Sequence, residues 1–375
     1  MRGLGRAKRV RYGGSINDRQ AEARKRGRGR LNTGRLKGIL LRTLLLPGAS
    51  LPFATLMKGR ATVFMLHHFR WPEMGVEGHD PGILRQCLAY LRRKRFNLLP
   101  LDDLFRGFIE GQPLRRAVAF TIDDGYLDQA AVGAPVFAEF DCPVTTFVTT
   151  GFLDGHLWFW WDQIEYVFKH TARREIQVSL GDARLTYAWK DEAGCRRAQA
   201  DFTAQCKEVP NAARLEGIRR LSTAAEVELP VRPPPCYSPM SWDQVRACEQ
   251  RGMTFGPHTV THPILSHTPD DQSQREICES WDRLRAEVQK PVAVFCYPNG
   301  RLQDFGAREV ATLRKLGFLG GVIGRPGYAD SSRFRGSPGG PFEVPRFGFP
   351  HTLPLVVQFV TGFERFKQLL RREVA

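Results

Sequence analysis

The chain has 375 residues, of which 42% are apolar, so it can bury a large α/β core, alone or with added segments. Its net charge of +16 is concentrated at the start, where residues 1–37 hold 13 Lys or Arg against two acidic residues. This composition excludes a folded core there. We interpret residues 1–37 as a basic disordered leader, either a solvated tail or a segment attracted to anionic lipid or nucleic acid.

The next segment, 38–60, begins with the apolar stretch GILLRTLLLPGASLPFATLM. Arg42, Pro47 and Pro52 interrupt this stretch, which makes it a poor spanning helix, and it lies too far along the chain for a secretory signal. Two alternatives stay open. It forms an amphipathic helix, so that residues 1–57 contact an anionic membrane surface, or it packs on the domain as a first helix.

The eight cysteines form no CxxC pair, and most of them lie within apolar or helical patterns. This distribution argues against a thiolate metal cluster and against a disulfide framework. We therefore expect reduced, buried thiols in a cytoplasmic protein, with the basic leader allowing peripheral contact with the inner face of the membrane. No recognised module for reading nucleic acid occurs in the rest of the chain, so a nucleic-acid partner is not expected.

From residue 61 to 350, short apolar runs alternate with segments of helical periodicity, and residues 351–375 end the chain as a predicted helix. Strands that alternate with helices at this spacing predict an α/β fold of parallel βα units, either a barrel or a doubly wound sheet. The predicted strands are 61–69, 117–122, 143–151, 253–258, 291–298 and 318–324, and the predicted helices are 81–96, 130–141, 240–252, 273–289 and 307–317.

One segment, 155–236, interrupts this alternation. It opens on an aromatic cluster, continues with a polar, helix-favouring composition and ends in the proline-rich run LPVRPPPCYSP. We predict a largely helical insertion between two βα units. The cluster Trp158, Phe159, Trp160 and Trp161 either anchors the core of the insertion or forms a surface on which a sugar stacks.

Polar groups follow four of the predicted strands. Asp123 and Asp124 end the run RRAVAFTIDDGYLD, two histidines end FMLHHF, and GPHTVTHP and FCYPNG end two more strands. The carboxyl ends of parallel strands share one face, where active sites gather, so these groups should converge. Asp-Asp-Gly alone usually marks a turn, and two histidines more often fill a core. Their joint position at strand ends favours a functional site.

His258 and His262 are four residues apart, without the Glu of a helical HExxH metalloprotease motif. Two imidazoles and one carboxylate form a three-ligand set with an open fourth position, which is typical of a catalytic zinc site. One of the two adjacent aspartates would be the third ligand, and the other would act as a general base on water. Gly125 permits the sharp turn after them.

The segments FTIDDGYLD, HTVTHPIL and FCYPNG resemble the successive motifs of the polysaccharide deacetylases, carbohydrate esterase family four, with a NodB-like domain. The resemblance extends from about residue 61 to 325, without the insertion. It implies a deformed (β/α) barrel that uses a divalent metal, usually Zn²⁺, to hydrolyse N-acetyl groups on amino sugars such as those of an exopolysaccharide, releasing acetate. Asp123 matches the catalytic base, and Asp124, His258 and His262 match the metal ligands.

In the third motif, Pro298, Asn299 and Gly300 match the segment whose backbone N–H, at Asn299, serves as the oxyanion donor. The resemblance is incomplete here. Many members carry an arginine in this motif that holds the base, whereas this chain has Cys296 at that place. Arg346 is the candidate for a guanidinium supplied from elsewhere, and a surface ion pair is the alternative.

The general acid is the second departure, because the late histidine of many members has no clear equivalent. FMLHHF is similar to the first segment of poly-N-acetylglucosamine-type deacetylases, in which the first histidine donates the proton. We therefore assign the acid to His67, with His68 and His351 in reserve and a core histidine as the alternative.

The primary prediction is thus a metal-dependent hydrolase that deacetylates the amino-sugar residues of a polysaccharide or glycan precursor. A deformylase or deacetylase of a lipid-linked sugar has the same chemistry and would agree with a leader that contacts the membrane. An inactive carbohydrate-binding relative is the alternative from another class, and the complete Asp-Asp/His/His set argues against it.

Overall fold

The computed structural model describes residues 43–46, 48–49, 51–336 and 339–372. The elements discussed below belong to the unit formed by residues 53–375. The predicted leader, 1–37, lies outside the described residues, as does the start of the segment 38–60; what is described of that segment ends in a short 3₁₀ helix, Leu51–Met57. The described helices include none with the length and apolarity that a membrane span requires.

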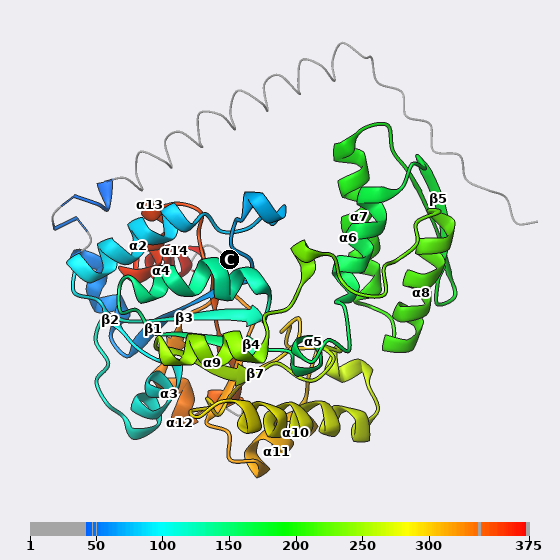
Figure 1. The fold of residues 1–375 in the computed structure, drawn as a ribbon. Coiled ribbons are helices and arrows are strands. Elements are labelled where there is room, and N and C mark those ends of the chain that lie inside the picture. The colour runs from blue at the N-terminus through cyan, green and yellow to red at the C-terminus, as the bar shows by residue number, and fades with distance from the viewer. Residues whose placement is uncertain (1–42, 47, 50, 337–338, 373–375) are drawn as a thin grey trace, which may run out of the picture. The chain divides into compact units, whose positions relative to one another are not determined.

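The central sheet consists of parallel strands in the order β1 (Arg60–Leu66), β3 (Ala117–Asp124), β4 (Val144–Val148) and β7 (Met253–Pro257) (Figure 1). All eight residues of β3 are buried, which explains why the sequence there is a nearly continuous apolar run. The predicted βα alternation is confirmed, with an α/β fold built on parallel strands.

A second parallel sheet has the order β11 (Val344–Pro345), β9 (Gly320–Ile323) and β8 (Val294–Cys296). The N–H of Val292, just before β8, donates to the carbonyl of Phe255 on β7 over 2.7 Å, which joins the two sheets along one side. On the other side, β11 pairs with β9, and β12 (Phe347–Gly348), one residue later, pairs with β1. The strand ends therefore surround one mouth, as in a deformed barrel.

The interior of the barrel is filled by small and branched side chains together with one large ring. Ala61 and Val63 of β1, Ala119 of β3, Phe147 of β4 and Val294 of β8 belong to one buried cluster. These residues alternate along their strands with residues that face the surrounding helices, as the pleat requires. The packed interior keeps the strand ends in fixed positions.

Helices cover the outside of the strands (Figure 1). The structure confirms the predicted helices but shifts their ends; Ser241, for example, caps α9 through a capping box, but Arg251, not Gly252, is its C-cap residue. The predicted helix 130–141 begins as a π turn, Gln129–Gly133, and the predicted C-terminal helix is two helices that meet near Gly362, at φ 89°. The helices are α2 (Pro81–Arg93), α3 (Leu101–Glu110), α4 (Ala134–Ala138), α5 (Thr150–Leu153), α9 (Trp242–Gln250), α10 (Asp270–Glu287), α11 (Ala307–Lys315), α12 (Ser331–Gly336), α13 (Leu353–Val360) and α14 (Phe363–Arg372), and two short strands, β2 (Asn97–Leu98) and β10 (Ala329–Asp330), flank the central sheet.

The insertion contains three helices, as expected, and also a β-hairpin that the sequence analysis did not predict. The helices are α6 (Trp160–His170), α7 (Glu192–Cys206) and α8 (Asn211–Ala224), and the hairpin is β5 (Glu175–Leu180) with β6 (Ala183–Ala188) (Figure 1). These elements share a core of their own, centred on side chains such as Ile164, Phe202 and Leu221.

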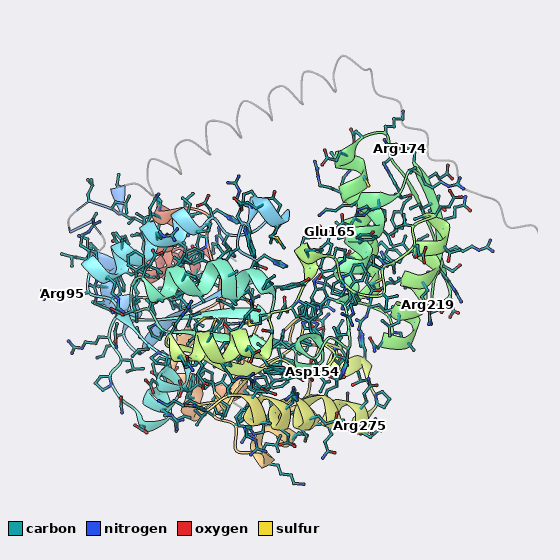
Figure 2. The ribbon with its side chains drawn as sticks, in the orientation of Figure 1. Arg95, Asp154, Glu165, Arg174, Arg219 and Arg275 are labelled. Atoms are coloured by element: carbon teal, nitrogen blue, oxygen red, sulfur yellow. The ribbon has the colours of Figure 1, made fainter. Side chains whose placement is uncertain are left out.

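The carboxylate of Asp154, just before the insertion, binds the barrel side. It accepts hydrogen bonds from the indole N–H of Trp242 on α9 and the guanidinium of Arg283 on α10, at 2.7 and 2.8 Å. Figure 2 shows Asp154 next to the helices of the barrel, whereas Glu165 lies on α6 and Arg219 on α8. This contact fixes the point at which the chain leaves the barrel.

Candidate active site

The two carboxylates lie at the end of β3, where the backbone turns sharply. Asp124 has φ 90° and Gly125 has φ 100°, both in the left-handed region. The side chain of Gln129 holds this corner, because its amide donates to the carbonyl of Asp123 over 2.6 Å and its oxygen accepts the N–H of Gly125 over 3.2 Å. The same amide donates to the carbonyl of His67 over 2.9 Å, which ties the end of β1 to the end of β3.

Asp124, His258 and His262 come together as a triangle of ligand atoms. The Oδ1 atom of Asp124 lies 3.6 Å from Nε2 of His258 and 3.7 Å from Nε2 of His262, and the two imidazole nitrogens are 3.1 Å apart. Four tetrahedral ligands at zinc bond lengths are about 3.4 Å from one another, so these separations fit one small cation. All three residues are buried, and their donor set suits zinc.

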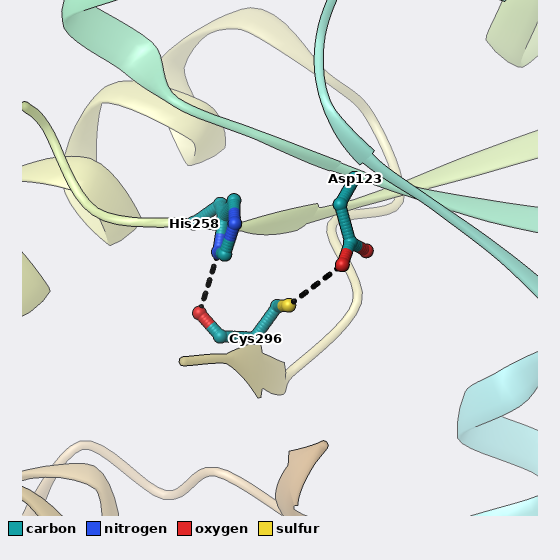
Figure 3. A group of neighbouring side chains, drawn as sticks. All are labelled: Asp123, His258 and Cys296. Atoms are coloured by element: carbon teal, nitrogen blue, oxygen red, sulfur yellow. Dashed lines mark hydrogen bonds between the residues drawn. The ribbon is translucent and has the colours of Figure 1, made fainter. Parts of the chain in front are cut away.

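The orientation of His258 is set by a hydrogen bond on the far side of its ring. Its Nδ1–H donates to the carbonyl oxygen of Cys296 over 2.7 Å, which leaves Nε2 for the triangle (Figure 3). A metal-binding imidazole typically has such a second partner, which fixes both the tautomer and the plane of the ring. Burial is the main cause that lowers the pKa of His262 to about 3, which favours the neutral imidazole that a metal ligand must be.

The loop between the two histidines has a strained backbone that a carboxylate holds in place. Thr259 and His262 have φ angles of 68° and 56°, which non-glycine residues seldom adopt. Glu276 of α10 accepts the N–H groups of Val260 and Thr261, each at 2.8 Å, and the hydroxyl of Thr261. Backbone strain of this kind persists where surrounding contacts enforce it, and it clusters at functional sites.

Asp123 forms a buried bidentate ion pair with Arg346, in which Nη1 and Nη2 each lie 2.7 Å from a carboxylate oxygen. Arg346 follows β11 and precedes β12, and it is 2% exposed, so the surface ion pair considered from sequence is wrong. Its Nη1 also donates to the hydroxyl of Thr121 over 2.9 Å. Burial alone would raise the pKa of Asp123, but the guanidinium lowers it below the usual value of a carboxyl group.

Cys296 lies against this ion pair. Its Sγ is 3.5 Å from Oδ2 of Asp123 (Figure 3). The same Sγ is 3.2 Å from Nη2 of Arg346. An arginine side chain at this position would occupy the space that the guanidinium of Arg346 already fills. The small residue at 296 therefore fits a site in which the guanidinium arrives from residue 346.

The thiol of Cys296 also lies near Asp123 and His258, as a second cluster of potential metal ligands. Burial raises the pKa of this thiol, and Arg346 occupies both oxygens of Asp123. Since a metal ligand must be deprotonated and accessible, the triangle that contains Asp124 is the better candidate.

The three histidines considered as general acid occupy different places. His67 is partly exposed, and its Nε2 lies 3.9 Å from Oδ2 of Asp123. His68 points its Nδ1 to Asp128 over 3.0 Å, in a contact that raises the pKa of the imidazole despite its burial. His351 does not join the site; it stacks on His79, in a separate cavity of about 250 Å³. The reserve assignment of His351 is therefore corrected.

The segment Pro298–Gly300 lies at the same mouth, where Asn299 lines the catalytic cavity. The side chain of Asn299 turns away to donate to Asp304 over 2.5 Å, and its φ is 60°. Its backbone N–H donates to no acceptor among the described residues. That arrangement leaves the N–H, and not the amide side chain, as the donor that the sequence analysis expected.

Comparisons with known proteins agree with this geometry. The family model for polysaccharide deacetylase matches residues 217–319, a segment that contains both histidines of the triangle and Asn299. The Streptococcus pyogenes deacetylase PplD, solved in complex with acetate, is similar over 80% of this chain and 98% of its own, at TM-score 0.52 and 17% identity. The matched segment is similar to the polysaccharide deacetylase family, and the likeness to the solved structure is one of fold.

A polysaccharide deacetylase from Bacillus cereus is similar over 81% of this chain and 69% of its own, at TM-score 0.50 and 13% identity. No curated protein matches the chain in sequence. The expected hydrolase of amide C–N bonds agrees with this family and fold, and the likeness to solved structures concerns the fold. The two carboxylates of β3 precede the segment that the family model matches.

The cavity at the mouth of the barrel measures about 500 Å³ and extends under the insertion. Trp160, Trp161, Thr203 and Lys207 of the insertion line it together with the triangle and Asp123. The expectation that the aromatic cluster anchors the core of the insertion holds for Trp160, which belongs to that core and also lines the cavity, whereas Trp158 and Phe159 are buried outside it. Trp161 is partly exposed, and its ring meets that of His262 edge to face, with centroids 4.6 Å apart.

Several positioning groups were not found from the sequence. Gln129 and Asp128 follow the Asp-Asp-Gly motif by a few residues and bind the ends of β1 and β3, so their proximity to that motif was the available signal. Glu276 and Lys207 had no such signal, because each lies far from the motifs and reaches the site only through helix packing.

Proposed function

We propose that this protein is a metal-dependent hydrolase that removes N-acetyl groups from the amino-sugar residues of a polysaccharide or glycan precursor and releases acetate. The observation that supports this most is the triangle of Asp124, His258 and His262 beside the ion pair of Asp123, inside one cavity. When bound at this triangle, a zinc ion would supply Lewis acidity toward the acetamide oxygen.

The residues of the chain would carry the proton transfers. Asp123 is held ionised by Arg346, so its carboxylate is ready to accept a proton from the attacking water as the new C–O bond forms. The N–H of Asn299 would donate to the oxygen on which charge develops. His67, 3.9 Å from Asp123, would give its proton to the nitrogen as the C–N bond breaks, leaving acetate and an amine.

The test is acetate release from a panel of N-acetylated glycans by the full-length, zinc-loaded protein, followed by an assay that also detects formate. Release of acetate that requires the metal supports the proposal. Metal retention without release of acetate or formate from any glycan of the panel would instead favour the inactive carbohydrate-binding relative.

A lipid-linked sugar is the second candidate substrate. This candidate rests on residues 1–57, a basic segment followed by an apolar one. Peripheral contact of these residues with an anionic membrane, and a cytoplasmic location, are part of that proposal. Comparing the full chain with one that lacks residues 1–37 for binding to anionic vesicles tests it, because loss of binding is expected only if the leader makes the contact.

A further inference from the structure

Lys207 is a cation in the wall of the cavity whose side chain is not held by an ion pair with any described residue. It is the C-cap residue of α7, lies half-buried in the cavity wall contributed by the insertion, and forms no ion pair among the described residues. The two nearest carboxylates are already bound, because Arg301 pairs with Glu208 at 2.7 Å and with Asp304 at 3.0 Å. Burial and the charge of Arg301 lower the pKa of Lys207, although the carboxylates of Asp304 and Glu208 partly offset them.

A second, independent feature lies behind this wall: Arg214 of α8 is a cation buried inside the insertion. It is 1% exposed, its Nε and Nη1 have no hydrogen-bond acceptor among the described residues, and its Nη2 donates to Asn211. Its guanidinium lies 4.8 Å from the ring centre of Trp160, which itself lines the cavity. Burial lowers the pKa of Arg214 to about 10, so it stays charged at neutral pH.

Lys207 in the cavity wall and Arg214 behind Trp160 are therefore two positive charges without an ion-pair partner among the described residues, near the cavity that the triangle and Asp123 also line. Burying an unpaired charge is costly, and such a cost is offset when an anion binds nearby. A neutral sugar would leave the ammonium of Lys207 unpaired in the bound state, whereas a phosphate or carboxylate would satisfy it with a charge-assisted hydrogen bond.

We propose that Lys207, backed by the charge of Arg214 behind Trp160, binds an anionic group of the substrate, so that the substrate is an N-acetylated amino sugar carrying a phosphate or carboxylate near its acetamido group. This inference rests on the proposed function for the identity of the reaction. It adds the class of substrate, and it makes the insertion the part of the chain that determines specificity.

Binding tests the inference without requiring turnover. Three probes are titrated into the full chain by calorimetry: N-acetylglucosamine 1-phosphate, the corresponding N-acetylated uronic acid, and the neutral methyl glycoside of N-acetylglucosamine. We expect at least one charged probe to bind about tenfold more tightly than the neutral one, because a hydrogen bond to a charged group is involved. The charged probe whose affinity exceeds that of the neutral probe by the larger factor shows whether phosphate or carboxylate is the recognised group.

The variants give the matched controls. Lys207→Met should remove the preference, and Lys207→Arg should retain most of it, because only the first loses the charge. Lys190→Met makes the same change at an exposed lysine of the insertion outside the cavity wall, and it should leave the preference intact. A merely structural role for Lys207 as the end of α7 would lower thermal stability in Lys207→Met without changing the ratio of the two affinities.

The outcomes separate this inference from the proposed function. If charged probes bind preferentially through Lys207 but no acetate is released from any substrate, the proposed reaction fails and the anion site stands. If acetate is released, but charged and neutral probes bind equally well and Lys207→Met changes neither affinity, the anion site is overturned and the reaction stands.

Discussion

The barrel and the insertion both line the cavity, but the residues that they contribute are held in place in different ways. In the barrel, two residues of the site are held by partners that lie far away in the sequence: Asp123 by Arg346, and His258 by the carbonyl of Cys296. In the insertion, Trp160 and Lys207 sit on helices that pack on a separate core and contact the barrel at few points. Such an arrangement lets the chemistry stay fixed while the wall that meets the substrate varies.

The largest effect is expected from substitutions at the metal ligands and the general base of the barrel. Asp124→Ala or His258→Ala removes one corner of the triangle and should abolish both zinc retention and acetate release. Asp123→Asn keeps the triangle and should retain zinc, while it lowers turnover by about 10²–10⁴-fold because the base is lost. Metal analysis after dialysis and acetate release under saturating zinc measure the two properties separately.

The exposed His170→Ala, in the insertion, is the control for loss of an imidazole, and it should change neither property. Activity that survives in Asp123→Asn would show that another group is the base. Zinc retention that survives in His258→Ala would show that the ion binds elsewhere.

The next largest effect concerns the strand that closes the barrel. Arg346→Met leaves the carboxylate of Asp123 buried without its partner, which should lower the free energy of unfolding by about 3–5 kcal/mol. The pKa of Asp123 should rise as well, so the pH at which activity appears should move upward. Arg346→Lys keeps the charge but not the two parallel hydrogen bonds. Its free energy of unfolding should therefore lie between those of Arg346→Met and the original chain.

Arg325→Met is the matched control, because residue 325 is exposed and its side chain makes no contact with the ion pair. Denaturant unfolding and the pH profile of acetate release are the measurements. An unchanged pH profile in Arg346→Met would contradict the role of Arg346 in keeping Asp123 ionised.

A smaller effect should be confined to the insertion. Phe202 is fully buried in the core of the insertion, and Phe202→Ala should destabilise it by about 3–5 kcal/mol through the cavity that is left. Zinc retention should persist, since the triangle belongs to the barrel. Limited proteolysis within 155–236, measured together with zinc content, tests whether the insertion is destabilised without loss of the metal. The control is Arg196→Ala, which removes an exposed ion pair on the same helix.

If Phe202→Ala loses zinc as readily as it becomes susceptible to proteolysis, the two regions fold as one cooperative unit. The comparison drawn above would then describe the arrangement of contacts but not their energetics.

The same division explains what could be predicted from the sequence. The aspartates of β3 were predicted to meet His258 and His262 because the ends of parallel strands share a face, and the choice of Asp124 as the ligand came from the resemblance to the deacetylases. The burial of Arg346 was not predicted, because it depends on residues 344–348 closing the gap between β9 and β1. Closure of a barrel is a property of all the strands together, which no local pattern states.

The insertion was harder to predict for a related reason. The sequence did contain a signal for the hairpin, because residues 175–180 alternate between exposed or half-buried and buried positions. This short strand pattern was overlooked because the residues around it favour helices. Lys207 had none, since whether a lysine at a helix end meets solvent or a cavity depends on how that helix packs. The reserve assignment of His351 as general acid was wrong for the same reason. It rested on the residue type alone, and in the structure His351 stacks on His79.

The smallest expected effect lies where the two regions meet, at a buried network of Asp162, Tyr126 and Trp161. The hydroxyl of Tyr126 donates to Asp162 over 2.8 Å and accepts the indole N–H of Trp161 over 3.0 Å. Burial raises the pKa of Asp162 to about 8, despite the hydrogen bond from Tyr126 and the nearby His68. The folded chain therefore keeps a proton on this carboxyl group between about pH 4 and 8, whereas the unfolded chain has released it.

Because the unfolded state binds fewer protons over that interval, this group should make the folded state less stable as the pH rises. Asp162→Asn stays neutral at every pH, so its thermal midpoint should fall less between pH 5 and 8 than that of the original chain, with the smallest difference at pH 5. Melting curves across that range measure the effect, and Asp201→Asn, which removes the more exposed carboxylate bonded to Tyr187, is the control. Parallel pH dependences in the original chain and Asp162→Asn would show that Asp162 is ionised in the folded state, and that the contact between barrel and insertion is held by a charged, not a neutral, carboxyl group.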